Sequence, residues 1–444
     1  MKKFPNALVI IISAIIFSWI LTYLIPQGEY LRITDPDSGI TEVVNNSYQK
    51  ISAEKLSAFD LLLAIPRGIV GSADIIALIL LLGGCFYVID KTGALKQGLS
   101  KLVNLLEGKE VLALIFVSAL FTAAGATIGL QEELIAMMPI LLLFGRSLGY
   151  NAFTTLYISY GSAVLGSSFG PSNPFAVLVA QEEAGLALLS GSEFRLIALC
   201  IAFVIWMAYL IYYAQGNRVE KVAMSSADER ISYSSQIILL LLVLTFCLVT
   251  YGLLTLGWGF NELSACFFAL GVVSGILGGL GINKTGEAYI KGFKEMVFAA
   301  MIIGLASSIS LLLTEGMIMD TLVYGLFSPL QYLPPAISGF LMMVSHALLH
   351  FPIPSYTAQA VMTMPILTPL SDLIGLSRQT CVLAYQYGAV MADMLVPTNG
   401  ALMAVIAISG IPYNKWFKFA IWPTLLMLLV GAITIMVAVA IGYE

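Results

Sequence analysis

The chain has 444 residues, of which 59% are hydrophobic and 11% charged, and its mean hydropathy is +0.93. Soluble domains carry roughly 25% charged residues, so the composition excludes an ordinary soluble protein and indicates a polytopic membrane protein. The net charge of -5 includes no basic cluster, which argues against a nucleic-acid partner. Five cysteines lie in apolar stretches without metal-ligand spacing. We interpret them as core thiols and expect no cofactor.

Apolar runs of about 20 residues predict the membrane-spanning helices. The first run follows Met1-Lys2-Lys3 like the apolar part of a signal peptide, but it is long enough to span and no small-residue cleavage site follows. We expect a permanent helix there. Two longer stretches, at 151–189 and 377–410, look like spans broken in the middle. Unbroken spans are predicted at Ala7–Leu24, Ser72–Ile89, Phe194–Ala214, Ser235–Tyr251, Ser264–Ile282, Glu295–Leu313 and Ile421–Ile441.

Two further apolar segments, at 110–145 and 336–371, have polar centres. Two crossings and a turn would need more residues than either segment has, because each crossing takes roughly 20 residues. We therefore predict two helical hairpins that enter the bilayer and return to the same side.

Short motifs recur about 226 residues apart, a pattern typical of transporters whose binding site lies between two repeats. Met138-Pro139-Ile140-Leu141 recurs as Met364-Pro365-Ile366-Leu367. Pro171-Ser172-Asn173 recurs as Pro397-Thr398-Asn399, and Tyr160-Gly161 as Tyr387-Gly388. A weaker echo relates Ala64–Leu95 to Ala288–Ile318, with Gly68 matched to Gly292 and Gly93 to Gly316.

The distribution of basic residues predicts that the two repeats are inverted. With the N-terminus inside and the C-terminus outside, the cytoplasmic loops hold all of the 21 Lys and Arg residues except Arg32, Lys50, Lys55, Arg67, Arg195 and Arg378. The first hairpin then opens to the cytoplasm and the second to the exterior. We expect the protein in the cytoplasmic (inner) membrane.

These features predict an all-α polytopic membrane protein built from inverted repeats, each with a re-entrant hairpin and a broken transmembrane helix. The predicted parts are first-repeat scaffold helices (1–108, with an extracytoplasmic excursion at 27–59), first-repeat transport elements (109–214: hairpin 110–145, broken helix 151–189, helix 194–214), a linker with an inverting helix (215–257), second-repeat scaffold helices (258–335) and second-repeat transport elements (336–444: hairpin 336–371, broken helix 377–410, helix 421–441).

The two breaks are predicted to line a polar cavity, because backbone groups freed from a helix in the bilayer need partners. Glycines and prolines interrupt the first at Gly166–Pro174, and the second, Asp393–Gly400, adds a carboxylate. Freed carbonyls can hold a cation, and the N-terminus of the second half-helix can present N–H groups to an anion. Asn173 and Asn399 are the firmest candidates, as amides that bridge ligand and backbone. A plain proline kink is the alternative.

Both hairpin tips also carry polar candidates. Glu132 and Glu133 cannot face the same way on a helix; we expect one to cap the returning arm and Glu132, nearer the tip, to be functional. At the second tip, hydroxyls and an amide supply neutral donors and acceptors, unless they only cap the ascending arm. These residues are Ser355, Thr357 and Gln359.

His346 and His350 share a helix face before the second tip. They lack the further ligands that zinc requires. A proton relay that includes His350 and Asp393 is one hypothesis for them, and polar packing between helices is the other.

The motifs resemble the ion transporter superfamily and, within it, the anaerobic C4-dicarboxylate carrier-like (YfcC-like) family, which includes arginine/ornithine exchanger-like members. The resemblance is carried by Gln131–Leu141, Tyr160–Gln181, His350–Leu367 and Tyr385–Ala404. It implies an elevator-type fold, a homodimer, and a mobile domain holding both hairpins and both broken helices. Carried over by position, the substrate- or ion-binding candidates are Gly129, Gln131, Glu132, Ser168, Gly170, Ser172, Asn173, Ser355, Thr357, Gln359, Asp393, Thr398 and Asn399.

The sequence thus predicts a secondary active transporter, not an enzyme, for a small carboxylate-bearing metabolite. Acidic Glu132 and Asp393, with no buried base, favour an amino acid with a positive group. A C4-dicarboxylate or related organic acid is the alternative, and an ion channel or a membrane-embedded enzyme fits the pattern less well. Sodium, in a site near Asn173 and Asn399, or a proton is the expected coupling ion.

Overall fold

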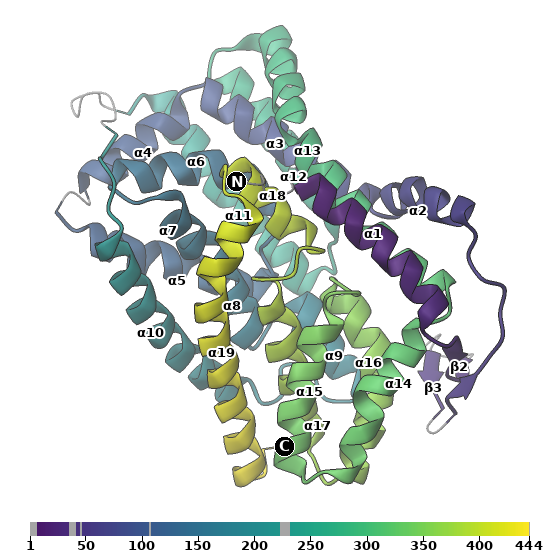
Figure 1. Ribbon diagram of the computed structural model, residues 1–444. Helices are drawn as coiled ribbons and strands as arrows, with labels where there is room; N and C mark the ends of the chain where they lie inside the picture. The colour runs from purple at the N-terminus through teal and green to yellow at the C-terminus, as the bar shows by residue number, and fades with distance from the viewer. Residues whose placement is uncertain (1–6, 35–40, 45–46, 106–107, 223–230, 444) are drawn as a thin grey trace, which may run out of the picture.

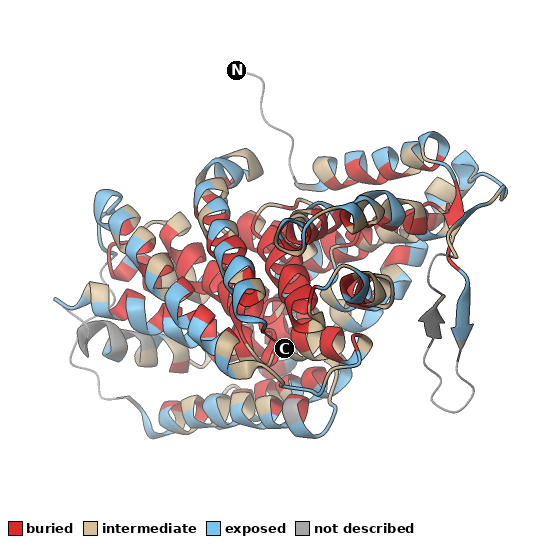
Figure 2. Cartoon of the chain, turned by 90° about the horizontal axis from the view of Figure 1, so that it is seen from below, coloured by how far each residue is buried: buried red, intermediate tan, exposed pale blue. Residues whose placement is uncertain are grey.

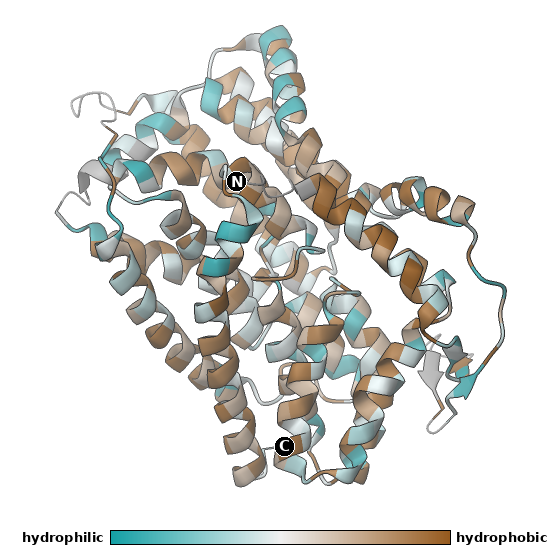
Figure 3. Ribbon diagram, viewed as in Figure 1, coloured by the Kyte–Doolittle hydropathy of each residue, from teal (hydrophilic) through white to brown (hydrophobic). Residues whose placement is uncertain are grey.

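The computed structural model describes residues 7–34, 41–44, 47–105, 108–222 and 231–443. The described chain is mostly helical, and its fully buried residues gather in the central helices while the outer helices expose apolar side chains (Figures 2 and 3). Seven described helices are long and apolar enough to cross a membrane. They are α3 (Ala73–Lys91), α5 (Glu110–Ile128), α10 (Ser192–Gly216), α11 (Tyr233–Thr255), α12 (Phe260–Leu277), α13 (Gly281–Glu315) and α19 (Tyr413–Ile441).

Other helices are shorter or interrupted. They are α1 (Ala7–Leu24), α2 (Ala58–Gly71), α4 (Ala94–Leu105), α6 (Glu133–Ser147), α7 (Ala152–Leu156), η1 (Tyr157–Gly161), α8 (Ser162–Phe169), η2 (Pro174–Leu178), α9 (Val179–Glu183), α14 (Met319–Phe327), η3 (Ser328–Tyr332), α15 (Pro335–Leu349), α16 (Tyr356–Leu373), α17 (Arg378–Tyr385), η4 (Gln386–Val390) and α18 (Gly400–Ile408).

Helix α13 corrects the sequence prediction for this part of the chain. The span predicted at Ser264–Ile282 ends at Leu277, because Gly278 caps α12 and Gly279 adopts a φ of +79°. A single helix then runs 35 residues from Gly281. At about 1.5 Å per residue it is longer than the hydrocarbon core. The lysines expected in a loop, Lys284, Lys291 and Lys294, therefore lie on this helix.

Close backbone crossings hold α13 against its neighbours. A Cβ at Gly292 would lie 2.6 Å from the carbonyl oxygen of Gly83 in α3, and one at Gly68 in α2 would lie 2.8 Å from that of Gly304. Helix α13 also contacts α1 and α18. At the α18 contact, a Cβ on Gly400 would lie 2.4 Å from the side chain of Ile303. Glycine is needed wherever α13 crosses another backbone this closely.

The excursion near the N-terminus is tied to α14 (Figure 1). Its strands pair as β1 (Gly28–Glu29) with β4 (Gln49–Lys50) and β2 (Arg32–Thr34) with β3 (Thr41–Val43), both antiparallel. Arg32 makes a bidentate ion pair with Asp320 at 2.6 and 2.7 Å. This hydrogen bonding raises the pKa of the Arg32 guanidinium. Tyr48 stacks on Tyr324 with ring centroids 4.1 Å apart.

The remaining helices converge in the centre (Figure 1). Helices α5 and α6 flank the first predicted tip, and α15 and α16 flank the second. The first broken helix comprises α7, η1, α8, η2 and α9, and the second comprises α17, η4 and α18. Helix α8 packs on α5, and α17 on α15. Each returning arm contacts the broken helix of the other half: α6 contacts α18, and α16 contacts α9.

Arg195 corrects the expectation that the chain has no buried basic side chain. It is in the first turn of α10 and is fully buried. Its guanidinium donates to the backbone carbonyl of Ser190 (2.9 Å), the hydroxyl of Tyr443 (3.0 Å) and the amide oxygen of Gln379 (2.9 Å). It therefore joins the ends of α10, α17 and α19.

Candidate functional site

The first hairpin turns between α5 and α6 at Gly129. This residue has a φ of +66°, and an added Cβ would lie 2.8 Å from the ring of Phe175, so the turn itself requires glycine. The N–H of Gln131 donates to the carboxylate of Glu133 (3.2 Å). The Glu133 carboxylate therefore stabilises the turn. Glu132 is half-buried and takes part in none of the ion pairs found among the described residues.

Asn173 caps the second half of the first broken helix. Its side-chain oxygen accepts from the N–H groups of Phe175 (2.9 Å) and Ala176 (3.1 Å), and its amide donates to the carbonyl of Gly125 in α5 (3.2 Å). Its backbone carbonyl accepts the N–H groups of Val177 and Leu178. The first N–H groups of this half-helix therefore all donate to Asn173. They are not free to bind an anion, as was predicted for this terminus.

The hydroxyls of both breaks tie them to the hairpins. Ser172 donates to the carbonyl of Ala126 (2.9 Å), and Thr398 donates to that of Phe351 (2.7 Å). A Cβ on Gly170 would lie 2.5 Å from that of Ala126, so this glycine permits the same close contact. Ser168 differs: it is fully buried, and its hydroxyl has no hydrogen-bond partner among the described residues.

The polar side chains at the second tip take three different roles. Exposed Ser355 caps α16 by accepting the N–H of Ala358 (3.4 Å). Exposed Thr357 donates to the carbonyl of Phe175 (3.1 Å), which connects this hairpin to the first broken helix. Gln359 is fully buried and faces the two histidines of α15.

Asn399 caps α18 in the way that Asn173 caps its own half-helix. Its oxygen accepts the N–H of Leu402 (2.7 Å), its backbone carbonyl accepts that of Met403, and its amide donates to the carboxylate of Asp393. The N–H groups of Gly400 and Ala401 do not donate in these bonds. This terminus, unlike the first, can offer donors to an anion.

Side chains that the sequence analysis did not select satisfy the carbonyls freed by the breaks. Tyr160 donates to the carbonyl of Asp393 (3.4 Å), and Gln386 donates to those of Ser167 (3.2 Å) and Gly170 (2.7 Å). Each bond joins one broken helix to the other. Tyr160 stood in a repeated motif, which was a usable signal, whereas Gln386 had none.

A buried hydrogen-bonded network connects the second hairpin to the second break. His350 Nδ1 lies 2.8 Å from Gln359 Oε1, and His350 Nε2 lies 2.7 Å from Asp393 Oδ1. Gln359 Nε2 lies 3.0 Å from both Nδ1 and the carbonyl oxygen of His346. The His350 and Asp393 side chains are fully buried. Asp393 Oδ2 has no partner among the described residues.

The two hairpin tips meet beside this network. The side-chain amide of Gln131 donates to the hydroxyl of Tyr356, whose ring stacks on His350 with centroids 5.6 Å apart. Tyr385 donates to the backbone carbonyl of Tyr356 (2.8 Å). Of the predicted residues, the structure therefore gathers Gln131, Gln359, Asp393 and Asn399 around His350 and Tyr356. Seven others contact their own turns or backbone of neighbouring elements: Gly129, Gly170, Ser172, Asn173, Ser355, Thr357 and Thr398. Glu132 makes no ion pair and Ser168 no side-chain hydrogen bond among the described residues.

The described residues contain no cluster of three or more His, Cys, Asp or Glu side chains that could hold a metal ion. The amide oxygens of Asn173 and Asn399 are engaged by backbone N–H groups. We therefore do not assign a cation ligand to either asparagine.

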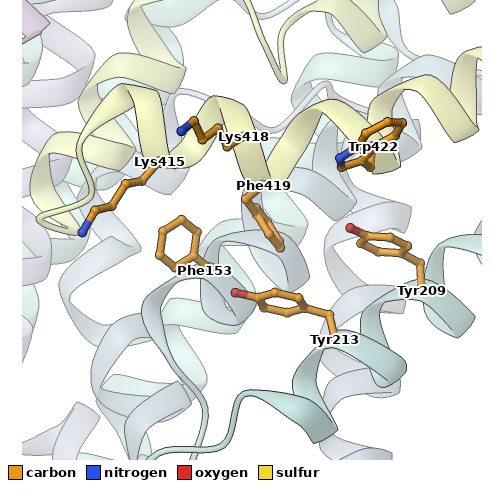
Figure 4. Close-up of a pocket in the computed structure, with 7 residues that line it drawn as sticks. All are labelled: Phe153, Tyr209, Tyr213, Lys415, Lys418, Phe419 and Trp422. Carbon is orange, nitrogen blue, oxygen red and sulfur yellow. The ribbon is translucent and has the colours of Figure 1, made fainter. Parts of the chain in front are cut away.

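An open groove of about 410 Å³ lies elsewhere, between α10 and α19 (Figure 4). Aromatic side chains and two lysines line it, which is typical of the boundary between membrane and water. None of the candidate residues is among them: the lining is Phe153, Tyr209, Tyr213, Lys415, Lys418, Phe419 and Trp422. The groove is therefore separate from the site between the tips.

Known proteins resemble the chain over its whole length. Residues 4–440 match the family model described as DcuC, C4-dicarboxylate anaerobic carrier. The chain is 27% identical to an uncharacterized protein of Haemophilus influenzae and 26% identical to the "Putative basic amino acid antiporter YfcC" of Escherichia coli. Each alignment covers 99% of this chain and 97% of the relative.

The fold resembles that of a solved transporter. The YdaH transporter of Alcanivorax borkumensis superimposes with a TM-score of 0.50 at 15% sequence identity, and the match covers 99% of each chain. The apolar helices agree with this likeness, since both indicate a multi-pass membrane protein. The chain belongs to the C4-dicarboxylate anaerobic carrier family of membrane transporters.

Proposed function

We propose that the protein is a secondary active transporter for a small amino acid that carries a positive group, bound between the two hairpin tips. The observation that carries this proposal is the unpartnered Oδ2 of buried Asp393. A buried carboxylate oxygen without a partner is costly, and a cationic group of a substrate would satisfy it. Half-buried Glu132, at the tip of the first hairpin, supplies a second carboxyl group.

The carboxylate of the substrate would bind at the N-terminus of α18. The N–H groups of Gly400 and Ala401 lie directly after Asn399, whose amide contacts Asp393. A ligand with both a cationic and a carboxylate group could then satisfy both parts of the site. The name of the Escherichia coli relative, "Putative basic amino acid antiporter YfcC", agrees with this substrate class.

Alternating access through inverted repeats is supported by pairs of matched contacts. Tyr160 bonds the carbonyl of Asp393, while Gln386 bonds that of Ser167. Ser167 and Asp393 are 226 positions apart, and Gln386 directly precedes Tyr387, the counterpart of Tyr160, so the two bonds lie at closely similar places in the two halves. The bonds from Ser172 and Thr398 to their hairpins correspond in the same way.

The scaffold helices contain corresponding contacts of their own. A Cβ on Gly68 would meet Ser308, and one on Gly292 would meet the backbone of Gly84. Ser72 bonds Ser307 at 2.5 Å, while a Cβ on Gly83 would meet Met296. The match of Gly68 to Gly292 also matches Gly84 to Ser308, Ser72 to Met296 and Gly83 to Ser307. Exchanging the halves therefore converts the first contact of each pair into the second.

Matched contacts occur both among the scaffold helices and among the hairpins and broken helices. They favour an elevator-type mechanism, in which the hairpins and broken helices move against helices α2, α3 and α13. We infer a homodimer in the cytoplasmic membrane, with the N-terminus inside and the C-terminus outside. The basic residues of the loops support that orientation.

A C4-dicarboxylate is the second candidate substrate, because the printed description of the family names it. Two carboxylates would have to bind beside Glu132 and Asp393, which makes the electrostatics unfavourable unless these groups are protonated.

A thermal-shift screen of the purified protein separates the two candidates, because a ligand that binds the folded state raises the melting temperature. The probes are L-arginine, L-ornithine and L-lysine against succinate, fumarate and L-malate. We expect stabilisation by the basic amino acids and its loss in Asp393→Asn. Stabilisation by the dicarboxylates alone would overturn the amino-acid proposal.

A further inference from the structure

The hydrogen bonds of Gln359 fix the orientation of its amide. Nε2 lies 3.0 Å from the backbone carbonyl oxygen of His346, which can only accept. The amide nitrogen therefore faces His346, and Oε1 faces His350 Nδ1 at 2.8 Å. Because Oε1 is an acceptor, Nδ1 of His350 must carry a hydrogen.

That hydrogen determines how many protons the His350–Asp393 pair holds. With Nδ1 committed to Gln359, a neutral His350 would point the lone pair of Nε2 at Asp393 Oδ1, only 2.7 Å away. Two acceptors repel at this distance, so a second hydrogen lies between them. The pair is either an imidazolium facing a carboxylate or a neutral imidazole facing a carboxylic acid. In both descriptions it holds one proton more than neutral histidine with ionised aspartate.

His346 offers an internal comparison. Its Nδ1 accepts from Gln359 Nε2, so its own hydrogen is on Nε2, which has no partner among the described residues. Neutral histidine satisfies this arrangement. The extra proton therefore belongs to His350 and Asp393, although the two histidines are one helical turn apart.

Few other charges face the pair. Glu132 of the first hairpin and Tyr160 of the first broken helix interact with Asp393. Tyr356 stacks on His350, and Tyr385 lies edge-on to His346. Glu133 is bonded to its own turn, and Tyr413 of α19 donates to the carbonyl of Leu395. From Met296 to Thr314, α13 has no titratable side chain.

No Lys or Arg pairs with Asp393 among the described residues, so His350 is its cationic partner when protonated. The same carboxylate is the one that the proposed function gives to the positive group of the substrate. Two cations therefore meet one carboxylate: the protonated imidazole on Oδ1 and the incoming ammonium or guanidinium on Oδ2.

Building on the proposed function, we propose that the proton held by His350 and Asp393 is the coupling ion, and that it exchanges for the cationic group of the substrate at the Asp393 carboxylate. When the substrate binds, the carboxylate pairs with it, and the N–H bond or O–H bond that held the proton breaks. The proton leaves to the aqueous side on which the site is open. His350 remains neutral with its hydrogen on Nδ1, so Nε2 and Asp393 Oδ1, now two acceptors, move apart or share a hydrogen of the substrate's cationic group.

The charges balance in this step. A neutral His350–Asp393 pair and a substrate of charge +1 give a neutral complex and one free proton. Exchange of a basic amino acid for a proton thus moves no net charge, whereas a zwitterion exchanged for a proton would move one.

The test is isothermal titration of the purified full-length protein with L-arginine, L-ornithine or L-lysine. Titrations in two buffers of different ionisation enthalpy give the number of protons released on binding. We expect about one proton per bound molecule, and therefore an affinity that falls about tenfold for each unit by which the pH is lowered. Each titration is run with sodium and with choline as the salt.

Two variants locate the proton. Glutamine in His350→Gln cannot hold a proton beside Asp393, so we expect weaker binding and a changed pH dependence of proton release. His346→Gln is the matched control, and it should still release about one proton, because His346 is neutral in the network. Thermal melting and size-exclusion chromatography check that both variants fold.

The outcomes separate the two proposals. Absence of binding by every basic amino acid would overturn the proposed function and this inference with it. Binding by the wild-type protein without proton release, with or without sodium, would overturn the inference alone. Proton release that disappears in Glu132→Gln while binding is retained would overturn the assignment to this pair and transfer it to Glu132.

Discussion

Gln131 of the first hairpin donates a hydrogen bond to the hydroxyl of Tyr356 of the second. Gln131 lies just before the returning arm α6, Tyr356 is the first residue of the returning arm α16, and the Tyr356 ring stacks on His350. Contact between the tips therefore reaches the buried network through one aromatic ring. Movement of either hairpin would change the surroundings of His350.

Tyr356→Phe removes the hydroxyl while retaining the ring. A neutral hydrogen bond contributes about 0.5–1.5 kcal/mol, so we expect a roughly two- to tenfold change in the KM for uptake, with the fold retained. Uptake by reconstituted vesicles measures it. Tyr332→Phe is the control, since Tyr332 is 83% exposed and away from the tips. Equal effects of both changes would contradict a role for the contact.

The caps of the two broken helices give a second prediction. Asn173→Ala removes an acceptor for two N–H groups, and a lost N-cap costs about 0.5–2 kcal/mol, so the melting temperature should fall. Asn173→Ser should restore part of the loss, because serine also caps helices. If uptake by correctly folded Asn173→Ala and Asn399→Ala is unchanged, neither amide contributes to the binding site.

Glycine crossings in the scaffold provide a third prediction. Gly292→Ala places a Cβ 2.6 Å from the backbone of Gly83 and Gly84, and overpacking of this kind typically costs about 1–3 kcal/mol. Gly286→Ala lies on the same helix with no heavy atom near its Cβ. Alanine favours helices over glycine by about 1 kcal/mol, so the control should melt higher. Similar melting of both variants would contradict the close crossing.

Sidedness can be tested with single cysteines. Cys200 and Cys247 are exposed and would first be replaced. Arg146→Cys and Asp372→Cys follow the first and second hairpins, and we expect a membrane-impermeant maleimide to label them from opposite sides in intact cells and inverted vesicles. Labelling from one side would remove the argument for inverted repeats.

The helix breaks and the turns at the two tips could be predicted because their signals are local. Proline and glycine interrupt apolar runs at fixed places, and the same motifs occur twice. The end of α12 was misplaced because two glycines lie within an otherwise apolar run, and apolar content alone does not mark a cap.

The roles of individual site residues were harder to predict. Asn173, Ser172 and Thr398 have the polar side chains that a ligand would use, but nearby backbone groups engage them first. Gln386 binds carbonyls more than 200 positions away. Such pairings depend on how helices from both halves are placed, which no local pattern encodes.

Helix α13 meets α18 at Gly400, where the absence of a side chain brings the backbone against Ile303. Because Gly400 has no side chain, α18 does not interlock with Ile303 at this point. Under the proposed elevator-type mechanism, the broken helix would therefore meet little steric hindrance as it moves along α13. The methyl group of Gly400→Ala would collide with Ile303 and hinder this movement, so the substitution should slow turnover more than it weakens substrate binding.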